Sequence, residues 1–372
     1  MNPQVPFNEL PKISEIVVDE TKLLLKLAED TRVSLELLNY EVKGLPSQDI
    51  LLDTLPLQEA KVSSEIENIV TTNDSLYKEI TFENISAESK EVVNYKDALF
   101  IGYTALKRKG LLSTSDLTTI NEPVNTKQKG VRQNLLGFEG NYTRLVNDVG
   151  GRKEIIYTPP HGVDLLNELL VDMLEYVYND EIFLVHPLIK IALTHFQFEC
   201  IHPFHDGNGR TGRILNILLL CQKGYLQYPI LYASAYIIRN KNEYYDLFQQ
   251  CIREADYTPF VYYILRSFKE TADKTLSMIL EIKAMLNHYK SEAFLSNLDG
   301  RKEELERAMD VIFRKVYVRI ADLKELGLHR ETASNYLQQL VTMGLLREEK
   351  RRNEKVFINR ELINLFEREE KI

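Results

Sequence analysis

The feature that most constrains this chain is a glycine-rich stretch, HPFHDGNGRTGR, that lies between two apolar segments. The segment before it, HPLIKIALTHFQFECI, and the segment after it, ILNILLL, both have the composition and spacing of buried helices. A loop that leads into the first turn of a helix can direct several backbone N–H groups at one point, where the helix dipole is positive. The stretch from His202 to Arg213 therefore predicts an anion site at the start of a core helix.

The charged side chains of this stretch suit a nucleotide. Arg210 and Arg213 are three residues apart and share one helix face, so two guanidinium groups can bind the oxygens of a polyphosphate. Asp206 supplies a carboxylate of the kind that Mg²⁺ uses beside phosphates, and a neutral His202 can take a proton from a hydroxyl group. Taken singly, these residues are equally typical of a turn, a solvated helix face and a structural histidine. Their coincidence within twelve residues favours the nucleotide site.

Two metal sites are alternatives for the same stretch. The run D-G-N-G-R begins like a calcium-binding loop, but Arg210 at its fifth position and Ile217 at its twelfth replace the oxygen ligands that such a loop requires. The pair His205-Asp206 resembles the centre of a histidine–aspartate phosphohydrolase. That site needs further ligands on later helices, and the histidines downstream do not lie in suitable contexts.

Composition limits the class of protein. The chain has 372 residues, which allows two or three domains, and a formal net charge of -9, which argues against a protein that coats nucleic acid. Three scattered cysteines do not form a disulfide framework, and no apolar run is long enough to cross a membrane. We expect a cytoplasmic protein without membrane contact.

The pattern along the chain predicts a mainly α protein in three parts. We expect a helical N-terminal region over residues 1–110, a helical core over 111–297, and a small α/β domain over 298–372. Within the core, NYTRLVNDVGGRKEIIYTPP predicts a β-hairpin with Gly150 and Gly151 at its centre.

The C-terminal part has the element order of a winged helix-turn-helix, with two short helices followed by a basic hairpin. Such a domain can bind DNA or can serve as a protein-docking or dimer module. For DNA, the candidates for base contacts are Ser334, Asn335 and Gln338. The candidates for phosphate contacts are Lys350, Arg351, Arg352 and Lys355. DNA is therefore a candidate partner, and a homodimer is a candidate assembly.

The glycine-rich stretch resembles the signature of the Fic family, H-x-F-x-[DE]-G-N-G-R-x-x-R. Every defined position is filled, by His202, Phe204, Asp206, Gly207, Asn208, Gly209, Arg210 and Arg213. The resemblance extends over about residues 1–290. It implies the Fic fold, a helical core with a β-hairpin flap, and an enzyme that transfers AMP from ATP to a hydroxyl group of a target protein, with the chain itself as one candidate target.

The resemblance also implies roles for single residues. His202 is the general base, and Asp206 holds Mg²⁺ against the phosphates. The hairpin aligns the target segment by strand pairing. The residues implied to contact ATP are Gly207, Asn208, Gly209, Arg210, Thr211, Gly212, Arg213, Gln197, Asn240 and Glu67. For Asn240, which precedes EYYDLF, a helix-capping role is an alternative.

A second short pattern resembles the inhibitory motif of the family, [ST]-x-x-x-E-[GN]. Ser63, Glu67 and Asn68 occupy its defined positions. The resemblance implies that Glu67 pairs with the second arginine of the signature, Arg213, and displaces the γ-phosphate of ATP. The alternative is a capping box, in which Ser64 and Glu67 bind backbone N–H groups at the start of a helix.

Two functions thus compete at this level. The first is an autoinhibited protein adenylyltransferase, and the second is a DNA-binding transcriptional regulator with a nucleotide-sensing Fic core. The presence of His202 favours the enzyme, because a sensor can bind nucleotide without a base. The residues do not distinguish ATP from UTP, GTP or CTP.

Overall fold

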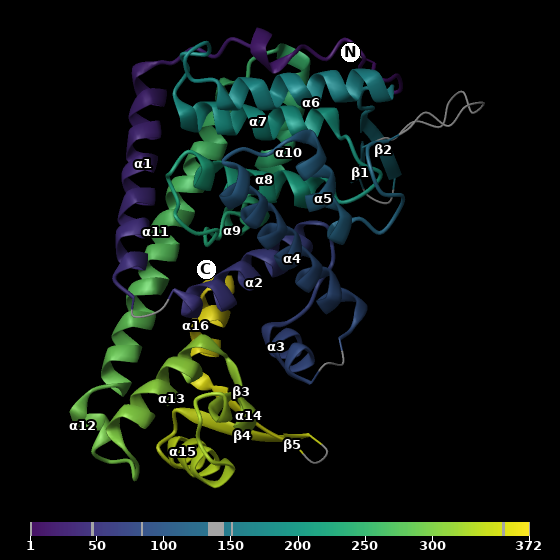
Figure 1. Ribbon diagram of the computed structural model, residues 1–372. Helices are drawn as coiled ribbons and strands as arrows, with labels where there is room; N and C mark the ends of the chain where they lie inside the picture. Colours follow the sequence, from purple (N-terminus) through teal and green to yellow (C-terminus); the bar gives the residue numbers. More distant parts are fainter. Residues whose placement is uncertain are drawn as a thin grey trace.

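The structure is a computed structural model that describes residues 2–45, 48–82, 85–132, 145–149, 152–351 and 354–371. The described chain is mainly helical, as predicted, with two small sheets (Figure 1). The helices are η1 (Ile13–Glu15), α1 (Lys22–Lys43), α2 (Asp49–Ile66), α3 (Asn73–Thr81), α4 (Ala87–Lys109), α5 (Thr114–Val124), α6 (Val163–Tyr178), α7 (Pro187–Ile201), α8 (Asn208–Gln222), α9 (Ser234–Arg239), α10 (Lys241–Glu254), α11 (Thr258–Tyr289), α12 (Glu292–Leu295), α13 (Lys302–Arg314), α14 (Ile320–Lys324), α15 (Arg330–Thr342) and α16 (Arg360–Lys371). The strands are β1 (Leu145–Val149), β2 (Arg152–Tyr157), β3 (Tyr317–Arg319), β4 (Leu346–Arg351) and β5 (Glu354–Asn359).

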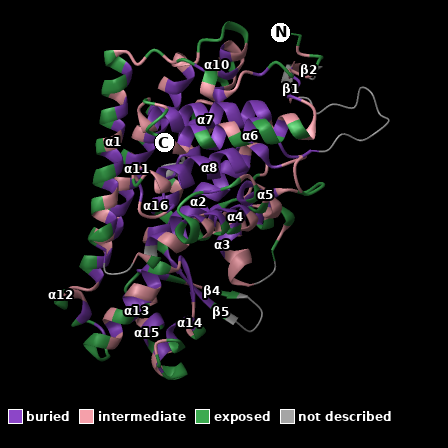
Figure 2. Cartoon of the chain, turned by 45° about the horizontal axis from the view of Figure 1, so that its top comes forward, coloured by how far each residue is buried: buried purple, intermediate pink, exposed green. Residues whose placement is uncertain are grey.

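The core is built around α7 and α8, the two helices that flank the glycine-rich stretch. From Leu188 to Ile201 every residue of α7 is buried, and so is every residue of α8 from Arg210 to Leu220 (Figure 2). A helix that is apolar on all sides has to be surrounded by other elements. Helices α2, α4, α5 and α7 pack against α8 and supply this cover.

Helix α2 has a proline in its interior. It spans Asp49–Ile66 and continues through Pro56. A proline inside a helix removes one backbone hydrogen bond. Leu51, Leu55 and Leu57 on both sides of it are buried, so packing offsets that loss.

The predicted hairpin is formed by β1 and β2, which pair antiparallel with Val149 opposite Arg152. Its central residues Gly150 and Gly151 lie outside the described residues. At the end of β2, the Tyr157 hydroxyl donates to the carbonyl oxygen of Cys200 at 2.9 Å. The base of the hairpin is thereby fixed to the end of α7.

The C-terminal part contains the predicted helix pair and hairpin, in the order α13, β3, α14, α15, β4, β5, α16. Its three strands form an antiparallel sheet with the order β3-β5-β4. On α15, the predicted recognition helix, Asn335 and Gln338 are exposed and Ser334 is partly exposed. Arg352 lies outside the described residues. No helix in the described part of the chain is long and apolar enough to cross a membrane.

Candidate active site

His202 occupies the position that ends α7. Its backbone lies in the left-handed region, with φ 47° and ψ 58°, which is uncommon for a residue other than glycine. The Nδ1 atom of the ring is buried and has no hydrogen-bond partner among the described residues. Burial, and secondly the charge of Arg132, lowers the pKa of His202 to about 4. The imidazole is therefore neutral at physiological pH, as a general base has to be.

Arg132 holds the chain around His202, and no pattern in its own segment predicts this role. Its Nε donates to the carbonyl oxygen of His202 at 2.7 Å, and its Nη2 donates to those of Ile201 and Pro160, both at 3.1 Å. Burial lowers the pKa of this guanidinium to about 10. One buried arginine thus joins the end of α7 to the segment that follows the hairpin.

Hydrogen bonds from two side chains of the glycine-rich stretch, those of Asn208 and Thr211, hold the loop in its conformation. The Asn208 amide accepts from the backbone N–H of Phe204 and donates to its carbonyl oxygen, both at 2.9 Å. Gly207 has a φ of 73°, and a Cβ there would lie 2.6 Å from the carbonyl oxygen of Val124. The Thr211 hydroxyl donates to the carbonyl oxygen of Gly207 at 2.8 Å. The side chains of Asn208 and Thr211 therefore shape the loop, which leaves its backbone N–H groups and the arginines to meet an anion.

Asp206 lies at the edge of this loop. Its Oδ1 accepts from the backbone N–H of Gly207 at 2.9 Å, and its Oδ2 accepts from the hydroxyl of Thr126. Burial opposes ionisation, but these hydrogen bonds and the charge of Arg210 hold the pKa of Asp206 below its usual value. The carboxylate is therefore charged at physiological pH.

Arg213 is 6% exposed and is fully engaged by the end of α2. Its Nε donates to the Ser63 hydroxyl at 2.7 Å, and its Nη2 donates to the Ser63 carbonyl oxygen at 2.9 Å and to Glu67 Oε1 at 3.0 Å. Burial opposes ionisation of Glu67, but Arg213, Arg210 and His202 hold its pKa below the usual value. The carboxylate of Glu67 thus lies on the guanidinium that the signature provides for an anion.

The local structure explains the inhibitory pattern and excludes the capping box. Glu67 follows the last residue of α2, so the segment ends a helix and does not begin one. Asn68 has a φ of 63°, a left-handed conformation that asparagine and glycine tolerate best. The pattern therefore requires Asn or Gly at this position to turn the chain directly after the carboxylate.

Arg210 has a different partner, which the sequence did not identify. Its Nη1 donates to Glu91 Oε2 of α4 at 2.5 Å, and its side chain is 4% exposed. The Nε atom of Arg210 is buried and has no hydrogen-bond partner in the part of the chain that the structure describes. Arg210 therefore has donor capacity left for an anion in the loop.

Glycines 209 and 212 allow two carboxylates to approach α8 closely. A Cβ on Gly209 would lie 2.4 Å from Glu67 Oε1, and a Cβ on Gly212 would lie 2.3 Å from Glu199 Oε1. Burial raises the pKa of Glu199 to about 7. Glu199 lies within the segment FQFECIHPF and is a further member of the site that sequence reasoning missed.

The two residues predicted to line the nucleotide pocket are placed differently. Gln197 is fully buried on another face of α7, and its Nε2 donates to the carbonyl oxygen of Pro11 at 2.9 Å, so the structure does not bring it to the arginines. Asn240 lies between α9 and α10, where its side chain does not cap the start of α10 but donates through Nδ2 to the carbonyl oxygen of Tyr236 in α9 at 3.0 Å. Its neighbour Lys241 donates to the carbonyl oxygen of Ile66 at 2.6 Å, which places Asn240 beside the end of α2.

A histidine–aspartate metal site needs several ligands close together. Across the described residues there is no group of three or more His, Cys, Asp or Glu side chains that could hold a metal ion. His195, which lies on α7 before the glycine-rich stretch, is buried, and its Nε2 lies 3.0 Å from the Tyr244 hydroxyl. Asp206 is the one acidic residue within the stretch 202–213, so an ion bound to it takes its further oxygen ligands from outside the stretch.

Three segments of the chain match models of known protein families. Residues 25–104 match the Fic/DOC family N-terminal domain, residues 112–220 match the Fic/DOC family, and residues 303–362 match the C-terminal domain described as "Protein adenylyltransferase SoFic-like". The chain is similar to "Protein adenylyltransferase Fic" of Culex quinquefasciatus, with 30% identity over 203 residues, which are 54% of this chain and 36% of that protein. It is also similar to the protein of the same name of Drosophila erecta, with 36% identity over 36% of this chain and 24% of that protein.

Two solved structures share the fold. A Fic family protein from Desulfovibrio desulfuricans has a TM-score of 0.54 and 20% identity, and the match covers 92% of this chain and 98% of that one. Fic-1 from C. elegans has a TM-score of 0.52 and 18% identity, and the match covers 70% of this chain and 74% of that one. The matched part of the chain spans about a third of the length of the Culex quinquefasciatus protein. With three successive domains of one family along its length and the complete signature at the start of α8, the chain belongs to the Fic/DOC family.

Proposed function

We propose that this protein is a protein adenylyltransferase that transfers AMP from ATP to the hydroxyl group of a Ser, Thr or Tyr side chain, in a target protein or in its own chain. The observation that carries the proposal is the arrangement of His202, Asp206 and two buried arginines around the loop that begins α8. The relatives from Culex quinquefasciatus and Drosophila erecta are named for the same activity.

His202 acts as the general base in this reaction. Its ring is neutral because burial lowers its pKa to about 4, and it takes the proton of the target hydroxyl as the oxygen attacks the α-phosphorus. A new bond forms between that oxygen and the α-phosphorus, and the bond from the α-phosphorus to the oxygen that bridges to the β-phosphate breaks. Pyrophosphate leaves with that bridging oxygen and with the electron pair of the broken bond.

The arginines and the N-terminus of α8 hold the triphosphate. Arg210 and Arg213 bind oxygens of the chain of phosphates, and the backbone N–H groups of the loop add to them. Asp206 fits Mg²⁺ because it is an ionised carboxylate at the edge of the loop, with the phosphates available to supply further oxygens. When bound, Mg²⁺ neutralises charge on the phosphates.

Glu67 inhibits the enzyme by occupying Arg213. Its carboxylate imitates a phosphate oxygen, and it lies where a Cβ on Gly209 would collide with it. A triphosphate that enters the loop cannot use Arg213 until Glu67 leaves. Ser63 supports the inhibited arrangement, because its hydroxyl and carbonyl oxygens accept the other hydrogen bonds of Arg213.

The hairpin of β1 and β2 presents the target segment. Its base is fixed beside His202 through Tyr157 and Cys200. An extended segment that adds a strand to the edge of this hairpin places its hydroxyl groups near the end of α7.

Incubation of the purified chain with α-labelled ATP and Mg²⁺ tests the proposal. We expect weak labelling of the wild type, strong labelling of Glu67→Gly, and little labelling of Glu67→Gly combined with His202→Ala. The absence of label from all three, with and without a cell lysate as a source of targets, would exclude the adenylyltransferase.

A DNA-binding regulator is the second candidate, and the exposure of Asn335 and Gln338 on α15 favours it. A gel-shift experiment at several salt concentrations, with Gln338→Ala as the variant, separates it from the enzyme. We further infer the three-part division at about residues 110 and 297. We also infer a cytoplasmic setting, which suits the free cysteines Cys200, Cys221 and Cys251.

A further inference from the structure

The inhibitory segment, residues 63–68, forms the end of α2 and the turn that follows it, and both α2 and the next helix, α3, contact the C-terminal domain. Helix α2 precedes Glu67, and α3 follows it after a short connection. In Figure 1, α3 lies between α4 and the strand β3 of the C-terminal domain. We call the contacts of α2 and α3 with residues 314–322, 347–349 and 366 the junction.

The α3 side of the junction has an aromatic centre. The ring of Tyr77 stacks on Tyr317 at a centroid distance of 6.1 Å and on Phe366 at 6.4 Å. The hydroxyl of Tyr77 also accepts from Gln58 Nε2 of α2 at 2.8 Å, so the two helices that flank Glu67 are joined to each other at the same point. A displacement of the C-terminal domain therefore changes the contacts of both α2 and α3, the helices on either side of Glu67.

Polar contacts surround this aromatic centre. They join α3 to two strands of the C-terminal domain, β3 and β4. They are Lys78 with Glu349, Asp74 with the hydroxyl of Tyr317, and the carbonyl oxygen of Thr81 with Arg319 Nη1 at 3.2 Å.

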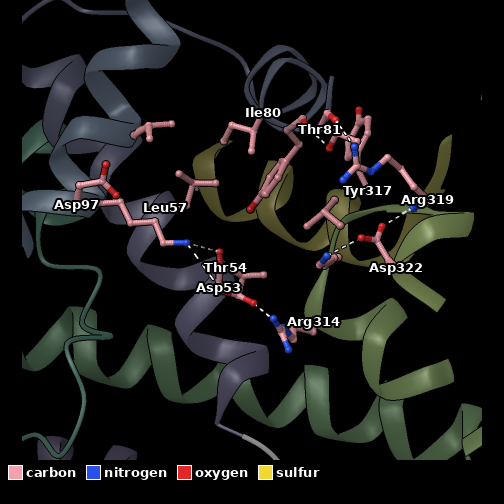
Figure 3. Close-up of a pocket in the computed structure, with 15 residues that line it drawn as sticks. Asp53, Thr54, Leu57, Ile80, Thr81, Asp97, Arg314, Tyr317, Arg319 and Asp322 are labelled. Atoms are coloured by element: carbon pink, nitrogen blue, oxygen red, sulfur yellow. Dashed lines mark hydrogen bonds and ion pairs between the residues drawn. The ribbon is translucent and has the colours of Figure 1, made fainter. Parts of the chain in front are cut away.

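The α2 side of the junction is hollow. Between α2, α3, α4 and the C-terminal domain lies a cavity of about 390 Å³ (Figure 3). At its rim, Arg314 Nε donates to Asp53 Oδ2 at 2.6 Å, and the two side chains are 44% and 39% exposed. Exposed ion pairs of this kind contribute little and are weakened by salt. The rim of the junction is thus polar and open to salt, whereas its aromatic centre is buried, with Tyr77, Tyr317 and Phe366 all less than 9% exposed.

From this we infer that the C-terminal domain regulates the inhibitor: while it holds α3, Glu67 stays on Arg213, and its separation from α3 releases Glu67. The inference rests on the proposed function. Glu67 itself depends on neighbouring contacts, because its carboxylate is 39% exposed and makes a single ion pair. The connection from Asn68 to α3 is short, so the position of α3 limits where the carboxylate can lie.

A charge exchange across the junction tests the inference. Lys78→Glu replaces the ion pair with Glu349 by two like charges and also faces Asp74. Lys78→Glu combined with Glu349→Lys restores opposite charges with the positions exchanged. Lys26→Glu, on the exposed face of α1, makes the same change of net charge away from the junction and is the matched control. Thermal unfolding of each variant checks that it is folded.

Two measurements are made on the full chain. The first is the initial rate of AMP transfer from α-labelled ATP, and the second is deuterium uptake of the peptide over residues 63–72 without nucleotide. We expect Lys78→Glu to raise the rate about fivefold or more and to raise the uptake, and the double variant to return both to the values of the wild type. Added salt should raise the wild-type rate and leave that of Glu67→Gly almost unchanged.

The outcomes separate this inference from the proposed function. A rate and an uptake that do not change in Lys78→Glu, while Glu67→Gly is strongly active, would overturn the regulatory role and leave the enzyme intact. If Glu67→Gly transfers no AMP, the proposed function fails. The uptake measurement then still decides whether the junction holds the inhibitory segment. Should Lys78→Glu prove unfolded, Tyr317→Phe, which keeps the ring and removes the hydrogen bond to Asp74, takes its place.

Discussion

Replacement of Glu67 by glycine should raise the rate of AMP transfer by about ten- to a hundredfold. Nη2 of Arg213, which is 6% exposed, donates to the Glu67 carboxylate at 3.0 Å, and the glutamate is 39% exposed. A charge-assisted hydrogen bond contributes about 1.5–3 kcal/mol, and each 1.4 kcal/mol changes the population of the open form tenfold. The exposure of Glu67 places the value in the lower part of that range, because water screens the pair. Position 67 lies beyond the end of α2 with φ -90° and ψ 15°, so glycine should not disturb folding there.

The assay compares initial rates of labelling from α-labelled ATP for the wild type, Glu67→Gly and Glu67→Gln. The glutamine should lie between the other two, because its amide oxygen can still accept from Arg213 but carries no charge. Glu65→Gln, in the last turn of the same helix and without an ion pair to the signature, is the control and should behave as the wild type. Equal rates for the wild type and Glu67→Gly, with both chains folded and binding nucleotide, would refute the reasoning.

Three further predictions concern the loop and its supports. In the Glu67→Gly chain, His202→Ala should lower the rate by about 10²- to 10⁴-fold in the labelling assay. Because burial lowers the pKa of His202 to about 4, the rate of AMP transfer should change little from about pH 7 to about pH 5. Below about pH 5 the rate should fall, because the ring takes up a proton and can no longer act as a base. A decline centred near the usual histidine pKa of about 6.5 would contradict a buried base. Arg132→Ala leaves three backbone carbonyls without their donor and should destabilise the fold by about 2–4 kcal/mol, measured by denaturant unfolding, and an unchanged midpoint would count against its supporting role. Gly207→Ala puts a Cβ 2.6 Å from the carbonyl oxygen of Val124 at a φ of 73° and should cost about 1–3 kcal/mol in the same measurement.

Periodicity and turn residues were enough to predict most of the fold. The buried helices α7 and α8, the β1–β2 hairpin and the order of elements in the C-terminal domain follow from patterns within each segment. The start of α2 does not, because the cost of Pro56 is local whereas the packing that offsets it comes from distant helices. The capping-box alternative failed for a related reason. The same Ser-x-x-Glu spacing fits a helix start and a helix end, and the ion pair of Glu67 with Arg213 forms across the fold.

The residues of the site also fall into two groups, those that a local pattern in the sequence indicates and those that only the folded structure reveals. Those inside the signature could be proposed from the sequence because several chemically distinct side chains occur in twelve positions. Arg132, Glu91 and Glu199 were missed, since each is an ordinary charged residue in its own segment and acquires its role only from burial beside the loop. Gln197 shows the reverse case. It lies five residues before His202, but the 3.6-residue period of α7 places it on a face that meets the N-terminal segment.

The gain from removing Glu67 should appear mainly in kcat and much less in KM for ATP. Glu67 forms its ion pair with Arg213, whereas Arg210 keeps a donor at Nε that has no partner among the described residues. ATP can therefore bind the inhibited chain with its triphosphate incompletely held, which affects the transition state more than the bound substrate. Measurement of both constants for the wild type and Glu67→Gly decides the point. A change confined to KM would mean that Glu67 excludes ATP as a whole, and the carboxylate would then be a simple competitor of the nucleotide.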